Sequence, residues 1–414
     1  MLNRPARWFH GWNVVGTAFL SQGFAIGLST STYGVYVLPI GADLDASRFQ
    51  TTLGYALLMA GLSVTAPIAG RLIERGSIRM IMIAGVVLLA SGLVLLSVAN
   101  HIAQIIMIYA TFIAVGATLA GALPASTLVV NWFDARRGRA LGISTVGASA
   151  GGLVLPPVAA NLIEQMGWRA SCQVLAAAAV LIAVPLIYWA VSNRPEDRSL
   201  VADGLQRARD PQTQRPIASS VGVPDILRSP AFWAVAVAAG AGNCVTSGLL
   251  VNIVPLAVDH GYEHTRSAYL ISIFTVGLVA GKLLIGAASD RFRTATLWQL
   301  SLGLAALGVL LVANVTSLSG LAVACAIAGL GSGGYYPLIG MSIADSFPRP
   351  AFGRVMGLVL PVLYLIALPG APLAGLVFDR AGSYVPAMWA FAGTLAVGAM
   401  AIRLGKPGRV TPGR

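Results

Sequence analysis

The strongest chemical signal in the sequence is Lys282, because this charged residue lies inside an otherwise apolar segment. It precedes the loop residue Asp290 by eight positions, or about 12 Å along a helix that rises 1.5 Å per residue. If the segment crosses a hydrocarbon layer about 30 Å thick, that depth is close to the midplane. A charge at the centre of such a helix costs about 2.5–3.5 kcal/mol on insertion scales. It therefore normally faces a cavity or a partner of opposite charge.

No carboxylate occurs in the sequence at a comparable depth, so we expect no salt bridge to Lys282 from within the protein. The partner is then water, the backbone or an anionic substrate. The alternative is a lysine whose stem snorkels to the membrane face, although 12 Å is a long reach for that side chain.

Several polar and aromatic residues in other apolar segments are candidates to share a cavity with this lysine. Tyr335 and Tyr336 follow a run of glycines, where aromatic rings could close over a substrate. Each candidate is equally explained by hydrogen bonding or packing between helices, so that interpretation stays open. The candidate substrate-binding residues are Lys282, Tyr335, Tyr336, Asn243, Thr246, Tyr364, Tyr33 and Gln22.

The other reactive residue types form no catalytic or metal-binding set. The four histidines lie at segment ends, and the three cysteines lie in apolar runs without metal-ligand spacing. No Gly-rich phosphate loop ending in Lys-Ser or Lys-Thr is present, which argues against an ATP-driven pump. We therefore expect no enzyme activity, no metal and no cofactor.

The composition identifies the environment in which this chemistry takes place. Of the 414 residues, 57% are hydrophobic and only 10% are charged, whereas a soluble domain carries roughly 25% charged residues. The net charge of +12 comes from basic residues placed singly in short links between apolar segments. Nucleic-acid binding needs them clustered on one soluble face, so we expect no nucleic-acid partner. The composition predicts an integral membrane protein.

Twelve apolar stretches are long enough to cross a membrane as helices. A polar stretch with six arginines and four prolines separates the sixth from the seventh, and it predicts a linker at 193–229 between domains at 1–192 and 230–414. The predicted fold is therefore all-α and integral to the membrane. The twelve stretches are 12–40, 51–71, 79–99, 102–131, 140–163, 170–192, 231–257, 268–289, 295–314, 317–344, 354–377 and 384–403.

The distribution of basic residues predicts the orientation of these segments. With the N-terminus inside, 22 basic residues fall on the inner side and four on the outer side, as expected for a cytoplasmic inner face. Both termini and the linker are then cytoplasmic. Because basic residues are almost all arginine and the loops are compact, we expect a bacterial inner membrane.

The two halves of the sequence repeat each other at an offset near 215 residues. Gly70 with Glu74 and Arg75 returns as Gly286 with Asp290 and Arg291, and Pro157, Glu164 and Gly167 return as Pro372, Asp379 and Gly382. Such repeats predict two six-helix bundles related by a pseudo-two-fold axis. A substrate site between the bundles near the midplane is typical of secondary transporters.

These residues resemble the major facilitator superfamily over essentially the whole chain. The family's loop after the second span has Gly, three residues, Asp-Arg, one residue and Gly. Gly70, Glu74, Arg75 and Gly76 follow this pattern with Glu for Asp and the second Gly one place early. Within the family, the chain looks like the monocarboxylate transporter and oxalate–formate antiporter group. The residues that carry this likeness are Gly11-Trp12, Tyr33-Gly34-Val35, the run 132–142 and Gly167-Trp168-Arg169.

The resemblance implies roles for several charges. Monocarboxylate carriers have an essential Arg in the eighth span, four residues before a Gly, and Lys282 and Gly286 keep that spacing. The Asp that those carriers place four residues before the Arg is Leu278 here. The resemblance also implies a conformational latch between the bundles on the cytoplasmic side. The alternative is that these arginines only follow the general preference of basic residues for the cytoplasmic side of a membrane protein. The implied latch residues are Gly70, Glu74, Arg75, Asp290, Arg291, Arg136 and Arg139.

These observations predict a secondary active transporter of a small organic anion, with Lys282 as the anion anchor. A single cation suits a monocarboxylate better than a dianion. Coupling would run by proton symport through Lys282 or by exchange for a counter-anion, and the family implies a monomer. The alternative function is an efflux pump for amphiphilic compounds, although a cationic-drug exporter usually carries a membrane carboxylate.

Overall fold

The computed structural model describes residues 9–133, 137–193, 195–198, 200, 222–288, 291–347 and 352–405. Within these residues every regular element is a helix, as the lack of water for backbone groups in lipid requires. The first half contains α1 (Gly11–Ile26), η1 (Gly27–Ser31), α2 (Tyr33–Asp43), α3 (Arg48–Arg75), α4 (Ile78–Ser97), α5 (Ile102–Ile108), η2 (Tyr109–Ile113), α6 (Ala114–Ala120), α7 (Ala122–Trp132) and α8 (Arg137–Ala190). Two short elements follow, η3 (Pro195–Arg198) and α9 (Val223–Arg228). The second half contains α10 (Pro230–Asp259), α11 (His264–Ala288), α12 (Thr294–Asn314), α13 (Leu318–Gly333), α14 (Tyr335–Ser346), α15 (Phe352–Ala367), α16 (Gly370–Ala381) and α17 (Val385–Leu404).

The helices in the described part of the chain account for the twelve predicted spans. Ten helical stretches in this part are long and apolar enough to cross a membrane. One stretch, Ala140–Ala190, has 51 residues and contains Gly167 with φ 81° and ψ 162°, which is not helical, so it makes two crossings. The segment from α1 to α2 adds another crossing, interrupted by the π-helical turn η1. The predicted fold class is thereby confirmed.

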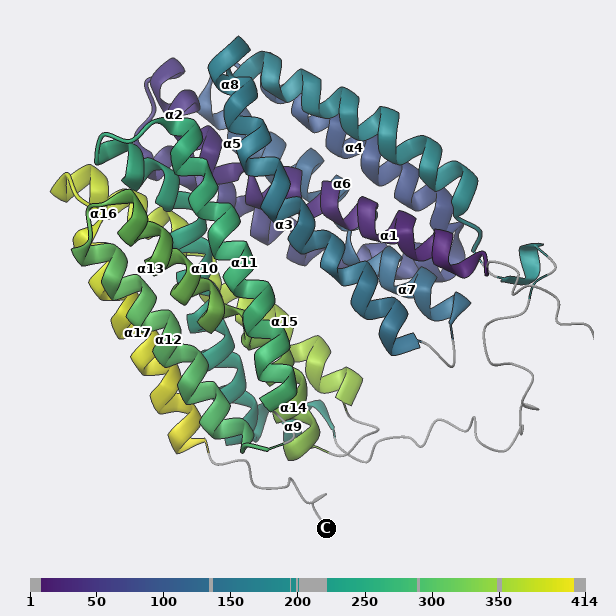
Figure 1. Ribbon diagram of the computed structural model, residues 1–414. Coiled ribbons are helices and arrows are strands. Elements are labelled where there is room, and N and C mark those ends of the chain that lie inside the picture. Colours follow the sequence, from purple (N-terminus) through teal and green to yellow (C-terminus); the bar gives the residue numbers. More distant parts are fainter. Residues whose placement is uncertain are drawn as a thin grey trace, which may run out of the picture.

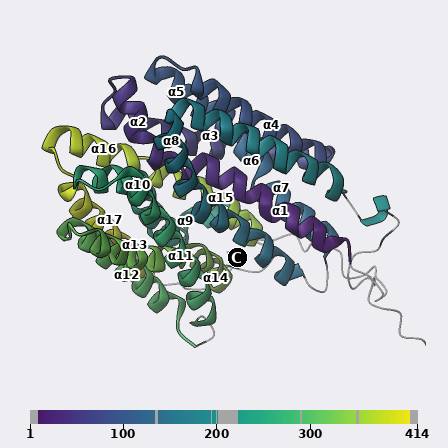
Figure 2. The same ribbon diagram turned by 45° about the horizontal axis from the view of Figure 1, so that its top comes forward.

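The crossings form two bundles, one from each half of the sequence. Figure 1 shows the purple-to-teal helices of the first half beside the green-to-yellow helices of the second, and Figure 2 shows the same division after rotation. The bundles converge near α2, α10 and α16 and diverge toward α7 and α14 (Figure 1). Contacts between them are made mainly by α11 with α8, α16 with α3 and α10 with α2.

Two names describe the ends of the molecule. The arginine-rich end carries the loops that begin or end at Arg75, Arg79, Arg291 and Arg293. The opposite, arginine-poor end carries four arginines, which are Arg48, Arg169, Arg266 and Arg380. The bundles therefore meet at the arginine-poor end.

Glycines bring helix backbones into direct contact within each bundle. In the first bundle, a Cβ built on Gly151 of α8 would lie 2.1 Å from the carbonyl oxygen of Gly23 in α1. In the second bundle, a Cβ on Gly281 of α11 would lie 2.1 Å from the carbonyl oxygen of Leu330 in α13. Small residues at such crossings let helices associate in lipid, where burial of apolar surface gives no net attraction.

This packing predicts opposite effects for two Gly-to-Ala substitutions in α8. Gly151→Ala places a methyl group against the backbone of α1 and should destabilise the protein by about 1–3 kcal/mol. Gly142→Ala is the matched control, because no atom lies within 4 Å of its Cβ, and alanine favours a helix. Thermal unfolding in detergent should show a lower melting temperature for Gly151→Ala and no decrease for Gly142→Ala. Equal melting temperatures would contradict the α1–α8 contact.

Candidate functional site

The position of Lys282 is determined by the contact between α11 and α13. A Cβ built on Gly333 of α13 would lie 2.8 Å from the backbone nitrogen of Lys282 and 2.1 Å from the carbonyl oxygen of Leu278. The two backbones therefore touch at the level of the lysine. The side chain itself is partly buried.

Helix geometry directs Lys282 toward the other bundle. Thr275 lies seven residues earlier in α11, and its hydroxyl would be 3.3 Å from a Cβ on Gly152 of α8. Seven residues make two turns, so Lys282 leaves α11 on the same face as Thr275, about 10 Å nearer the arginine-rich end. The lysine thus lies on the face of α11 that is turned toward the first bundle.

Lys282 has no acidic partner among the described residues. The ion pairs found there are Arg48 with Asp259, Arg169 with Asp43 and Arg266 with Glu263, all at the arginine-poor end. No hydrogen bond from the Lys282 ammonium group occurs in this part of the chain, and Leu278 occupies the position one turn earlier. A cation at this depth therefore depends on water or on an incoming anion.

Two predicted residues of α10 lie on its partly exposed face. Asn243 and Thr246 are partly exposed, as is Leu250, whereas most of α10 is buried. The Thr246 hydroxyl donates to the Ser332 hydroxyl at 3.1 Å. Because Ser332 directly precedes Gly333, this bond places Thr246 at the same depth as Lys282. The Asn243 amide donates to the Ala239 carbonyl at 2.9 Å, one turn back along the helix.

Tyr336 and Tyr364 lie together on the second bundle. Their hydroxyl oxygens are 3.5 Å apart, and Tyr336 is 44% exposed. Tyr55 of α3 in the first bundle lies near both of them, so the three phenols come together across the interface. Tyr55 is not among the residues predicted from the sequence. The signal in the sequence is a tyrosine within an apolar span, because a buried phenol hydroxyl needs a hydrogen-bond partner.

The other three predicted residues pack inside a single bundle. The Gln22 amide donates to the Ser144 carbonyl at 3.0 Å, between α1 and α8. The Tyr33 hydroxyl donates to the Thr51 carbonyl, and its ring packs against Tyr109. Tyr335 stacks on Trp298 with ring centroids 6.1 Å apart. Consecutive helical residues point about 100° apart, so Tyr336 faces the other bundle while Tyr335 faces its own core.

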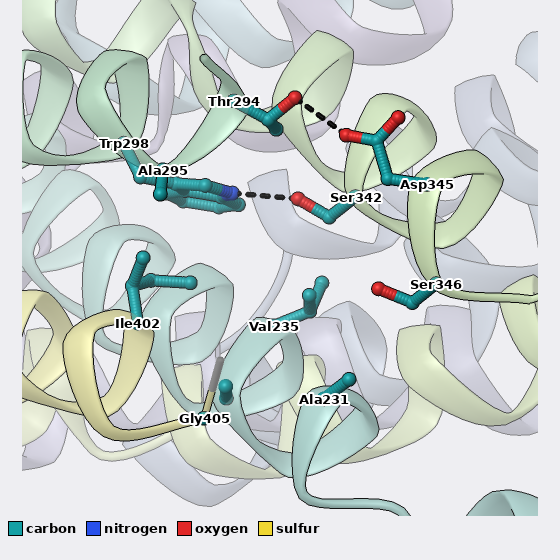
Figure 3. A pocket seen from close by; sticks show the side chains of 11 residues that line it. Ala231, Val235, Thr294, Ala295, Trp298, Ser342, Asp345, Ser346, Ile402 and Gly405 are labelled. Carbon is teal, nitrogen blue, oxygen red and sulfur yellow. Dashed lines mark hydrogen bonds between the residues drawn. The ribbon is translucent and has the colours of Figure 1, made fainter. Parts of the chain in front are cut away.

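A small cavity lies inside the second bundle, away from the interface. Its volume is about 30 Å³, enough for a water molecule. Figure 3 shows that the Trp298 indole nitrogen donates to the Ser342 hydroxyl, at 2.9 Å, and that Thr294 donates to the Asp345 carboxylate, at 2.7 Å. Four of its polar side chains thus bind in pairs, whereas the Ser346 hydroxyl has no hydrogen-bond partner in the described part of the chain. The cavity is a packing feature of α10, α12, α14 and α17.

Most of the predicted latch falls outside the described residues. This holds for Asp290 and Arg136 and for the side chains of Glu74, Arg75 and Arg139. Gly70 lies in α3 with no atom within 4 Å of its Cβ position, and Arg291 is exposed. The latch stays a prediction. Hydrogen bonds between the bundles in the described part lie toward the arginine-poor end.

Two membrane-spanning bundles with polar residues between them at mid-depth define the class of protein, a secondary transporter. The comparisons with known proteins agree. The sequence profile described as Major Facilitator Superfamily matches residues 19–273 and 243–413. The chain therefore belongs to the Major Facilitator Superfamily, whose members are transporters and not enzymes.

Relatives with different named functions resemble the chain to a similar degree. Monocarboxylate transporter 11 of Mus musculus is 26% identical over 90% of this chain and 82% of its own length. The Fujikurins efflux protein of Gibberella fujikuroi is 26% identical over 82% of this chain and 70% of its own length. The crystal structure of a bacterial homolog of the human lysosomal transporter Spinster, in an inward-facing conformation, has 16% identity and a TM-score of 0.76. It covers 97% of this chain and 98% of its own, and it shows the fold alone.

The different orientations of Tyr335 and Tyr336 predict different effects of removing their hydroxyl groups. The Tyr335 hydroxyl is buried without a hydrogen-bond partner among the described residues, so Tyr335→Phe should leave transport unchanged and the melting temperature equal or higher. Tyr336→Phe should weaken substrate binding by about tenfold, the loss of one hydrogen bond of about 1.4 kcal/mol. Binding titration and thermal unfolding of the two variants measure this. Reversed effects would contradict the assignment of the two rings.

Proposed function

We propose that the protein is a secondary active transporter that moves a small organic anion, a monocarboxylate, across the membrane by alternating access. The observation that carries the proposal is Lys282, which lies on the face of α11 turned toward the other bundle without an acidic partner among the residues described. A bound carboxylate would supply the missing negative charge. The similarity to monocarboxylate transporter 11 supports this substrate class.

The surrounding residues suit a small carboxylate. The ammonium group of lysine is a compact point charge with three donors and lacks the planar fork with which arginine binds both carboxylate oxygens. Further donors would come from the Tyr336 and Tyr364 hydroxyls and from Asn243 and Thr246. Leu250 and Leu278 supply apolar surface for the carbon chain. One cation favours a monoanion over a dianion.

Two coupling routes are compatible with this site. The residue one turn before Lys282 is Leu278, so no carboxylate at that position can bind a transported proton. In symport, Lys282 itself would lose and regain the proton, because desolvation favours the neutral amine. In exchange, a counter-anion would neutralise Lys282 during the return step. Either route keeps an unpaired charge from crossing the bilayer alone.

We further propose that the arginine-rich end is cytoplasmic, in the inner membrane of a bacterium. The 22-to-4 distribution of basic residues supports this orientation. Both termini and the linker at 193–229 would then be cytoplasmic, between bundles at 1–192 and 230–414. The arrangement described above would be inward-facing, and the protein would act as a monomer.

Efflux of amphiphilic compounds is the second candidate function. The similarity to the Fujikurins efflux protein favours it, since that relative matches the chain about as well as the monocarboxylate transporter does. The function gives Lys282 no necessary role unless the exported compound is an anion. A growth-protection panel in an export-deficient strain tests it, and protection that persists in Lys282→Gln would support efflux.

Uptake into proteoliposomes tests the proposed function. Labelled lactate, pyruvate, formate and oxalate are offered with and without an inward proton gradient, and with liposomes empty or preloaded with anion. Lys282→Gln should insert normally, and its uptake should be at least about tenfold lower, because a hydrogen bond to a charge contributes about 1.5–3 kcal/mol. Lys282→Arg should keep part of it. Unchanged uptake by Lys282→Gln would overturn the role of this lysine.

The accessibility of Asn243 tests the proposed orientation. Asn243→Cys adds a thiol on the partly exposed face of α10, while the three native cysteines are buried and serve as the background. A membrane-impermeant maleimide should label this variant in inside-out vesicles and not in right-side-out vesicles. Saturating substrate should slow the labelling. Labelling from the outer side alone would overturn the orientation.

A further inference from the structure

At the arginine-poor end, two carboxylates reach from one bundle to the first turn of a helix in the other. Asp379, near the end of α16, accepts hydrogen bonds from the backbone N–H groups of Arg48 and Phe49, at 2.9 and 2.8 Å. These are the first two residues of α3. Glu164, in α8, accepts from the backbone N–H of Thr265, the second residue of α11, at 2.8 Å.

The first turn of α3 needs Asp379 to be complete. The N–H groups of a helix's first turn have no partner within the helix. The N–H of Gln50 is bound by the Ser47 side chain and that of Thr51 by the Ser47 carbonyl. The remaining two N–H groups, of Arg48 and Phe49, both bind Asp379. The cap of this helix is therefore divided between the two bundles.

The two contacts are related by the internal repeat. Glu164 and Asp379 are 215 positions apart, and each stands three residues before a glycine with positive φ, Gly167 or Gly382. Phe49 and Thr265, the second residues of their helices, are 216 apart. The same device thus occurs twice, once in each direction across the interface.

Other contacts accompany the two carboxylates. The Arg48 guanidinium pairs with Asp259 of α10 at 3.3 Å, and the Ser272 hydroxyl donates to the Leu153 carbonyl at 2.6 Å. A Cβ on Gly375 of α16 would lie 2.7 Å from the Arg48 carbonyl oxygen. The backbones therefore approach closely only while these helix ends stay together.

The geometry assigns Glu164 and Asp379 to a paired gate that holds the arginine-poor end closed and must release for that end to open. A carboxylate at a helix N-terminus gains both hydrogen bonds and favourable interaction with the helix dipole. Because each bond joins opposite bundles, it contributes to the closed arrangement only. Separation exposes three N–H groups and two carboxylates to water. The population of the closed state should therefore depend on both residues.

Spin-label distance measurements on the purified full-length chain test the gate. His101→Cys and Ser319→Cys place labels at exposed positions of the arginine-poor end in opposite bundles, while the buried native cysteines stay unlabelled. Loss of a helix N-cap typically shifts an equilibrium about fivefold. We expect Glu164→Ala and Asp379→Ala each to raise the ratio of long to short distances about fivefold, and the double variant about 25-fold. Asp379→Asn, which keeps one acceptor oxygen, should lie between.

Glu263→Ala is the matched control. This acid lies at the same end but pairs with Arg266, three residues away in sequence. Its removal should leave the distances unchanged. An unchanged distribution in Asp379→Asn and both Ala variants would overturn the gate, as would an equal shift in Glu263→Ala. The inference rests on transport by two moving bundles and not on the anion, so it is decided without substrate and separately from the uptake assays.

Discussion

The contact between the backbones of α11 and α13 is the constraint on which the rest of the site depends. Glycines at 281 and 333 allow it, since any side chain there would collide with a carbonyl oxygen of the facing helix. The contact fixes the rotation of α11, so that Lys282 faces the other bundle. It also places Ser332 beside Thr246 of α10 and leaves Tyr336, the second residue of α14, partly exposed. One close helix crossing thereby brings together residues from four elements.

In the transport cycle that we propose, the lysine and the closed arginine-poor end would have complementary roles. Lys282 is a cation in a region of low polarity without an acid nearby in the described chain, so its environment is completed only by water or an anion. The closed end is held by hydrogen bonds that satisfy helix termini across the interface. In the proposed function, the first feature would favour binding of an anion from the arginine-rich end. The second makes the bundle arrangement two-state, because the caps are either formed or broken.

The membrane crossings could be predicted from the sequence, whereas the contacts of individual side chains depend on how the helices pack. The twelve crossings were predictable, because an apolar stretch of sufficient length has few alternatives in lipid. Lys282 was predictable as the only charge at mid-depth, and its exposure to the interface followed from the cost of burying it. The contacts of Gln22, Tyr33 and Tyr335 were not predictable. A polar residue in a span gives the same sequence pattern whether it binds a neighbouring helix or a ligand. Tyr55 was missed for the same reason.

The sequence by itself determined the membrane environment, the number of membrane crossings and the repeated halves. Hydrophobic length and internal similarity are properties of segments and need no neighbour to be read. Only the tertiary structure decided which face of each helix meets which partner, and hence that Glu164 and Asp379 cap helices of opposite bundles. A helix that is apolar on every side carries no amphipathic pattern to indicate its rotation. Its orientation depends instead on backbone contacts and hydrogen bonds that form only when the bundles assemble.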